Sequence, residues 1–102
     1  MILIRVAAES PVASVAGAIA QSVRAHRRSE VQSIGAAANN QAIKAVALAR
    51  RYMAEEQIDL AMIPSLIDVQ INGLTRTAVR MSVFPIDDLN KHRPNNGNGR
   101  RA

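Results

Sequence analysis

The stretch between Ile34 and Arg51 contains the residues best suited to bind a charged ligand. It predicts a strand that ends at Gly35, a short loop, an amide pair at Asn39 and Asn40 that can cap a helix, and then an alanine-rich helix. The start of such a helix directs free backbone N–H groups and the positive end of its dipole towards one spot. That spot favours an anion, often a phosphate group.

Two interpretations of this loop remain open. In the first, Gly35 permits a tight turn from strand to helix, and Asn39 or Asn40 only caps the helix. In the second, the same N–H groups form a phosphate seat, and Lys44, one turn into the helix, adds a positive charge. Lys44 is equally consistent with an ordinary solvated helix lysine.

Further cationic side chains are candidates for contacts with nucleic-acid phosphates. The densest group is Arg24, Arg27 and Arg28, near the predicted end of the first helix, where cations also complement the helix dipole. Arg76 and Arg80 follow a predicted hairpin turn, and such a hairpin is either an arm that reaches into a groove or an ordinary connection.

A third basic group, Arg50 and Arg51, lies near the end of the second predicted helix. Glu55 and Glu56 follow at a spacing that allows ion pairs within the helix. Such pairs would neutralise the arginines, so both a phosphate contact and a helix-stabilising role remain open for this group.

The residue types needed for catalysis or metal binding do not form a recognisable constellation. The chain has no cysteine, and His26 and His92 are far apart without a spaced second histidine. Asp87 and Asp88 lie at the edge of the predicted domain, where a carboxylate pair is usually only solvated charge. No serine has the flanks of a nucleophile elbow, and Gly35 is not part of a phosphate-loop motif. We therefore expect no enzyme activity, no cofactor, no metal and no small-molecule substrate.

The elements that position these residues follow from hydrophobic periodicity and from turn signals. A buried strand is expected from Ile2 to Val6, and Ser10-Pro11 predicts the start of a helix that runs to about His26. The later elements are a strand at 30–34, a helix at about 39–53, strands at 58–63 and 66–71, a turn at Asn72-Gly73 and a strand at 76–85.

The order β-α-β-α-β-β predicts an α+β fold of two layers. A four-stranded mixed sheet carries both helices on one face, and the other face is bare in a monomer. Exposed apolar surface of that kind suggests self-association. Residues 1–86 form the single folded domain, whereas the polar, Asn- and Gly-rich residues 87–102 are expected to be a flexible basic tail.

The composition limits the class of protein. Of the 102 residues 48% are apolar but only 2% are aromatic, so the core is aliphatic and base-stacking platforms are missing. The net charge of +5 suits an anionic partner but is modest for a DNA-coating protein. The absence of cysteine, of a signal peptide and of a long apolar segment predicts a cytoplasmic protein with no membrane contact.

Several motifs resemble those of the stage V sporulation protein S family. They are SPVASVAGAIA at 10–20, IGAAANNQAIKAVALAR at 34–50, Asp59-Leu60, Ile63-Pro64, DVQING at 68–73 and Arg76-Thr77-Ala78. The resemblance covers residues 1–86 and stops at the tail. It implies the fold of the Alba proteins, which are dimers that bind DNA or RNA, and a regulatory role in sporulation, development or cell division.

Two features depart from the Alba pattern. Alba proteins place lysines in the loop after the first strand, but here that loop contains Glu9, which would repel a phosphate. The basic tail, with Lys91, Arg93, Arg100 and Arg101, is also not part of the family's shared core.

Two functional hypotheses follow. The first is a non-enzymatic regulator of the Alba type, a homodimer or larger homo-oligomer, that binds DNA or RNA by backbone contacts. In it, Gly35, Asn39, Asn40 and the basic residues named above contact phosphates, and the tail adds a nonspecific anchor. The second is an interaction module that self-assembles and binds protein partners without nucleic acid.

Overall fold

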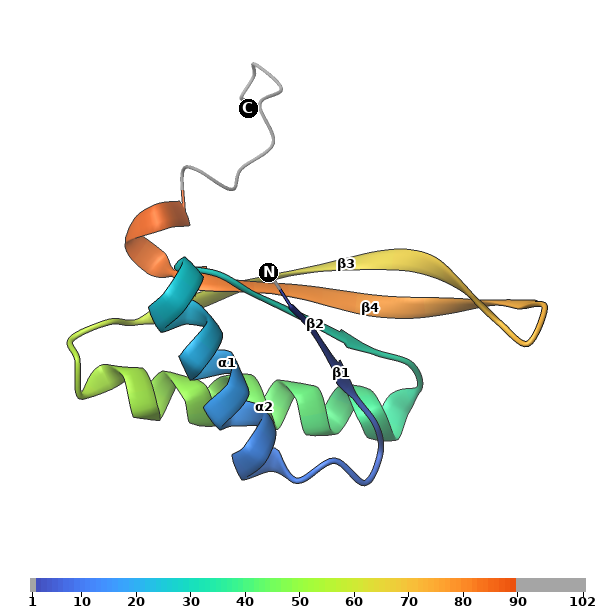
Figure 1. Ribbon diagram of the computed structural model, residues 1–102, viewed down its shortest axis with the longest axis horizontal. Helices are drawn as coiled ribbons and strands as arrows, with labels where there is room; N and C mark the ends of the chain where they lie inside the picture. Colours follow the sequence, from blue (N-terminus) through green and yellow to red (C-terminus); the bar gives the residue numbers. More distant parts are fainter. Residues whose placement is uncertain (1, 90–102) are drawn as a thin grey trace, which may run out of the picture.

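The computed structural model describes residues 2–89 and confirms the order β-α-β-α-β-β (Figure 1). The elements are β1 Leu3–Val6, α1 Val12–His26, β2 Ser29–Ser33, α2 Ala36–Ala54, β3 Leu60–Ile71 and β4 Leu74–Pro85. A short 3-10 helix, η1 (Ile86–Asp88), follows β4. The tail expected at 87–102 lies mostly outside the described residues.

One mixed sheet contains all four strands, in the order β1-β2-β4-β3. β1 is parallel to β2, and β4 is antiparallel to both of its neighbours, β2 and β3. Both helices lie on the same side of this sheet, which confirms the predicted two-layer arrangement (Figure 1). Val31 and Met81 are buried in the core against the helices, so their chain neighbours Gln32 and Arg80 point to the opposite side. We call that side the open face.

The core between helices and sheet is aliphatic and rich in alanine. Ala16, Ala42, Ala45 and Ala49 are completely buried where the helices pack against each other and the sheet. Alanine favours helix formation, and its small side chain lets the two layers approach closely. The few large core side chains, such as Ile19, therefore fill much of the remaining space.

Both helices begin differently from the sequence prediction. α2 starts at Ala36 rather than near Asn39, because Gly35 at φ 92° turns the chain at once and the alanines that follow favour helix. Neither asparagine caps it: the Oδ1 atom of Asn39 accepts a hydrogen bond of 2.6 Å from the Ser33 hydroxyl. Similarly, Pro11 precedes α1, and Ser10 Oγ accepts the backbone N–H of Ala7 instead of a helix N–H.

β3 and β4 form one long hairpin. The two strands predicted at 58–63 and 66–71 are a single strand that continues through Pro64. Proline is tolerated there because β3 is an edge strand and needs no outward N–H. The predicted turn is confirmed, with positive φ at Asn72 (53°) and Gly73 (78°). The far half of this hairpin, residues 66–77, extends beyond the helices, and we call it the arm (Figure 1).

Candidate functional site

Two arginines predicted near the end of α1 are held in ion pairs with distant carboxylates. Arg24 Nη2 lies 2.7 Å from Oε2 of Glu56, just after α2. Arg27 donates from Nε to Asp88 Oδ2 at 2.9 Å and from Nη2 to Asp88 Oδ1 at 3.3 Å. These hydrogen bonds raise the pKa of both arginines. Their charges are locally compensated, which makes them weak candidates for phosphate contacts.

Arg28 belongs to a side-chain network on the open face. Its Nε donates to Glu30 Oε2, and its Nη2 donates to Ser82 Oγ at 3.3 Å. The Ser82 hydroxyl in turn donates to Glu30 Oε2 at 2.8 Å. The network is neutral in total, and the side chain of Glu30 is only 16% exposed. Arg28 therefore compensates a half-buried carboxylate.

Arg50 pairs outside its helix, contrary to the pairing considered from the sequence. Its Nε donates to Asp59 Oδ1 at 2.9 Å and its Nη2 to Asp59 Oδ2 at 3.3 Å. The hydrogen bonds from Arg50 and from the backbone of Leu60 lower the pKa of Asp59. Glu56, one of the two glutamates considered as a partner, forms its ion pair with Arg24 instead.

The outward side of α2 carries a second group of predicted residues. Asn40, Lys44 and Arg51 are exposed there, and their side chains form no ion pair within residues 2–89. Lys44 and Arg51 are seven residues apart, which is about 10 Å along a helix. This surface faces away from the sheet and is therefore separate from the open face.

A polar row crosses the open face through all four strands. The strand register aligns Arg5 with Gln32, Gln32 with Arg80, and Arg80 with Ser65. Arg80 donates from Nε and Nη2 to the Gln32 Oε1 atom, at 3.2 and 2.8 Å. Within the described part of the chain, neither Arg5 nor Arg80 pairs with a carboxylate. The row therefore carries two uncompensated positive charges.

Arg76 extends this positive surface into the arm. It lies opposite Val69 and, four residues from Arg80 on the same strand, points to the same face. Four residues of an extended strand span about 13 Å. Arg76 is exposed and has no ion pair with the residues that the structure describes. Arg5, Arg76 and Arg80 thus form the open-face cations.

Comparison with known proteins identifies the family. Residues 2–86 match the family model described as Stage V sporulation protein S (SpoVS). The chain belongs to the stage V sporulation protein S family. The resemblance noted in the sequence is confirmed, and membership in this family links the protein to sporulation.

The stage V sporulation protein S domain also has a known structural neighbour. Alba from Thermoplasma volcanium superposes with a TM-score of 0.57 at 10% sequence identity, covering 81% of this chain and 99% of that chain. At this identity the likeness concerns the fold alone, and it confirms the predicted Alba-like architecture.

The fold of this stage V sporulation protein S domain divides the predicted site residues between two surfaces. Arg76 and Arg80 lie on the open face, whereas Asn40, Lys44 and Arg51 lie on α2. Sequence reasoning missed Arg5 and Gln32. A usable signal existed for Arg5, because a single charged residue in an otherwise apolar strand must point away from the core.

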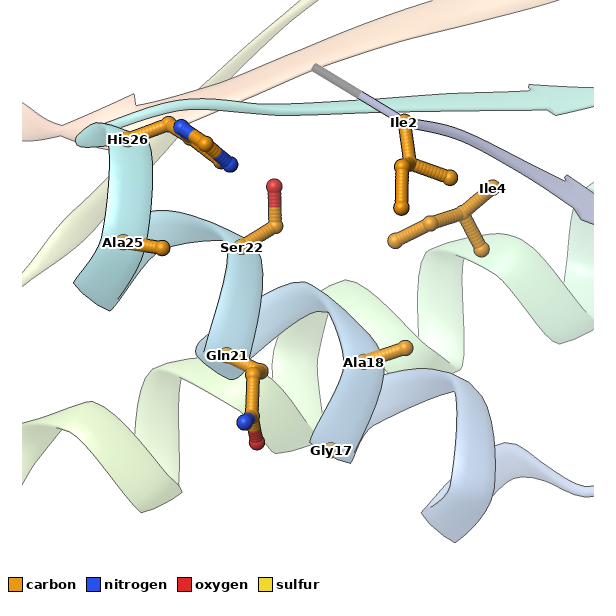
Figure 2. Close-up of a pocket in the computed structure, with 8 residues that line it drawn as sticks. All are labelled: Ile2, Ile4, Gly17, Ala18, Gln21, Ser22, Ala25 and His26. Atoms are coloured by element: carbon orange, nitrogen blue, oxygen red, sulfur yellow. The ribbon is translucent and has the colours of Figure 1, made fainter.

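A groove of about 360 Å³ lies between β1 and α1 (Figure 2). Ile2 and Ile4 line one side, and α1 contributes small residues such as Ala18 and Ala25. Among the residues that the structure describes, His26 is the single titratable group in its wall.

Within residues 2–89, no three His, Asp or Glu side chains cluster closely enough to hold a metal ion. No helix in the same range is both long and apolar enough to span a membrane.

Proposed function

We propose that this member of the stage V sporulation protein S family is a non-enzymatic regulator that binds nucleic acid through backbone contacts, as a homodimer. The observation that carries the proposal is the set of open-face cations, which lack carboxylate partners among residues 2–89 while Arg24, Arg27, Arg28 and Arg50 are all paired. Guanidinium groups without a carboxylate partner keep an uncompensated charge that attracts phosphates, although Arg80 also donates to Gln32.

The chemistry of this face favours backbone contacts over base recognition. Arginine matches phosphate oxygens with a planar fork of donors. Aromatic side chains, which stack bases in many single-strand binders, are limited to Tyr52 and Phe84, and Phe84 is fully buried. Binding should therefore depend strongly on salt and weakly on base sequence.

The direct test is binding of the purified protein to a labelled duplex and to a single-stranded RNA, measured by fluorescence anisotropy at 50 and 200 mM salt. Each phosphate contact contributes about 0.9 to the slope of log affinity against log salt concentration. Three contacts therefore predict a loss of affinity of about 40-fold over this range. Absence of binding to either probe at 50 mM salt would reject the proposal.

The arm supports a second candidate function, self-assembly or protein binding without nucleic acid. On the open-face side, the arm carries Ile67, Val69, Ile71 and Leu74 around Arg76, and Leu74 is 68% exposed. The other side carries Leu66 near its base and, towards the tip, hydrogen-bonded polar pairs, Gln70 with Thr75 and Thr77 with Asp68. A two-stranded hairpin with one apolar side is marginal in water, which favours a partner against that side.

Replacing Leu74 with glutamate is expected to convert a self-associated protein to monomer, because a charge would be buried in the apolar contact. Thr75→Glu is the matched control, since it adds the same charge on the polar side of the arm and should leave the assembly intact. Light scattering coupled to gel filtration measures both. A monomeric wild-type protein, or equal effects of both variants, would reject the arm as the contact.

A further inference from the structure

A hollow of about 280 Å³ lies where β1 and β2 end and α2 begins. Its wall includes Arg5 and Gln32 from the sheet and Ala38 from the first turn of α2, and none of the described residues in it is acidic. The two parallel strands end at this edge, where open α/β sheets commonly bind ligands.

Gln32 presents hydrogen-bond donors to this hollow. A guanidinium can only donate, so the two bonds from Arg80 fix the Gln32 oxygen on the β4 side. The amide NH₂ group is therefore turned the other way, and no residue within 2–89 accepts a hydrogen bond from it. Gln32 is only 9% exposed, but its amide nitrogen is not fully buried, so the unused donors can reach a ligand in the hollow.

Arg5 stands next to these donors. It occupies the position directly across from Gln32 on β1, and neighbouring strands are about 4.8 Å apart. Glu30, two residues before Gln32 on the same face of β2, already accepts from Arg28 and Ser82. Arg5 forms no ion pair with a carboxylate among residues 2–89, and its register position lets its guanidinium reach the Gln32 amide, so one anion could bind both.

The start of α2 adds a third contribution. Gly35 precedes the helix without any side-chain cap, and Asn39, the asparagine expected to cap it, is bonded to Ser33. The N–H groups of the first turn therefore remain available as hydrogen-bond donors. The positive end of the helix dipole lies at the rim of the hollow.

We propose that this hollow is a phosphate-group site formed by Arg5, the Gln32 amide and the first turn of α2. Its biological role rests on the proposed nucleic-acid binding, in which it would hold one backbone phosphate. The same chemistry would hold a free phosphate or a phosphorylated small molecule. Lys44, assigned to the seat from the sequence, lies on the outward side of α2 and is not part of this site.

The test is titration of the ¹⁵N-labelled protein with inorganic phosphate, with chloride at equal ionic strength as reference, followed by NMR. We expect saturable shifts of the Gln32 side-chain NH₂ signal and of the backbone amides of residues 35–38. Gln32→Glu should weaken phosphate binding at least tenfold, because its carboxylate would itself accept from Arg5 and Arg80. Gln21→Glu, which adds the same charge at an exposed position on α1, should change it less than twofold.

A second variant covers the case in which Gln32→Glu does not fold. Glu9 is exposed and follows Ala8 in the wall, so Glu9→Gln should tighten phosphate binding by about two- to fivefold. NMR shifts that depend only on ionic strength, and are equal with phosphate and chloride, would overturn the site. If a duplex still bound, the proposed function would stand without this site. Saturable phosphate binding without duplex or RNA binding would support the site, assign it to a phosphorylated small molecule and reject the proposed function.

Discussion

Simultaneous replacement of Arg5, Arg76 and Arg80 with alanine is expected to weaken duplex binding by about 100- to 1,000-fold in 50 mM salt. The three side chains carry the unpaired charge of the open face, and each phosphate contact adds about 0.9 to the salt slope. The slope should therefore fall by nearly three. Anisotropy titrations of wild type and variant at several salt concentrations measure both quantities.

The chain supplies a matched control for this experiment. The triple variant Arg24→Ala, Arg27→Ala and Arg50→Ala removes the same number of positive charges, but from guanidinium groups already paired with Glu56, Asp88 and Asp59. Its fold-loss of duplex affinity should be less than a tenth of that of the open-face variant. The salt dependence of its binding should stay close to that of the wild type. Equal losses in both variants would mean that net charge alone drives binding and that the open face has no special role.

The fold was predictable because its signals are local. Helical spacing of apolar residues, Ser10-Pro11 and Asn72-Gly73 each act over a few residues, and their order determines the number of layers. The helix start predicted near Asn39 was wrong because Gly35 already turns the chain and the alanines after it favour helix. The sequence shows an asparagine that can cap, but not the Ser33 hydroxyl that uses its side chain instead.

The candidate site was less predictable because it depends on pairings between distant residues. Arg27 and Asp88 are separated by 61 positions, and Arg80 and Gln32 by 48. Clusters of arginine in the sequence therefore suggested a cationic surface where the fold places ion pairs. Arg5, a lone cation in an apolar strand, gains its importance only from the register that aligns it with Gln32.

Replacement of Ile19 with alanine is expected to lower the free energy of unfolding by about 2–5 kcal/mol. Ile19 is completely buried in a core made mostly of valine and alanine, whose short side chains reach poorly into the cavity that the substitution leaves. For a domain of this size, each kcal/mol shifts the melting temperature by about 4–8 °C. Thermal and urea unfolding followed by circular dichroism measure the change.

The matched control is Ile43→Ala, which removes the same atoms from α2 where the side chain is 48% exposed. It should cost less than about 1 kcal/mol, since surface substitutions rarely cost more. The difference between the two variants measures how rigidly the alanine-rich helix layer holds its spacing over the sheet. If Ile19→Ala cost no more than Ile43→Ala, the helices would be free to collapse onto the sheet. The spacing of the layers would then be set by something other than the few large core side chains.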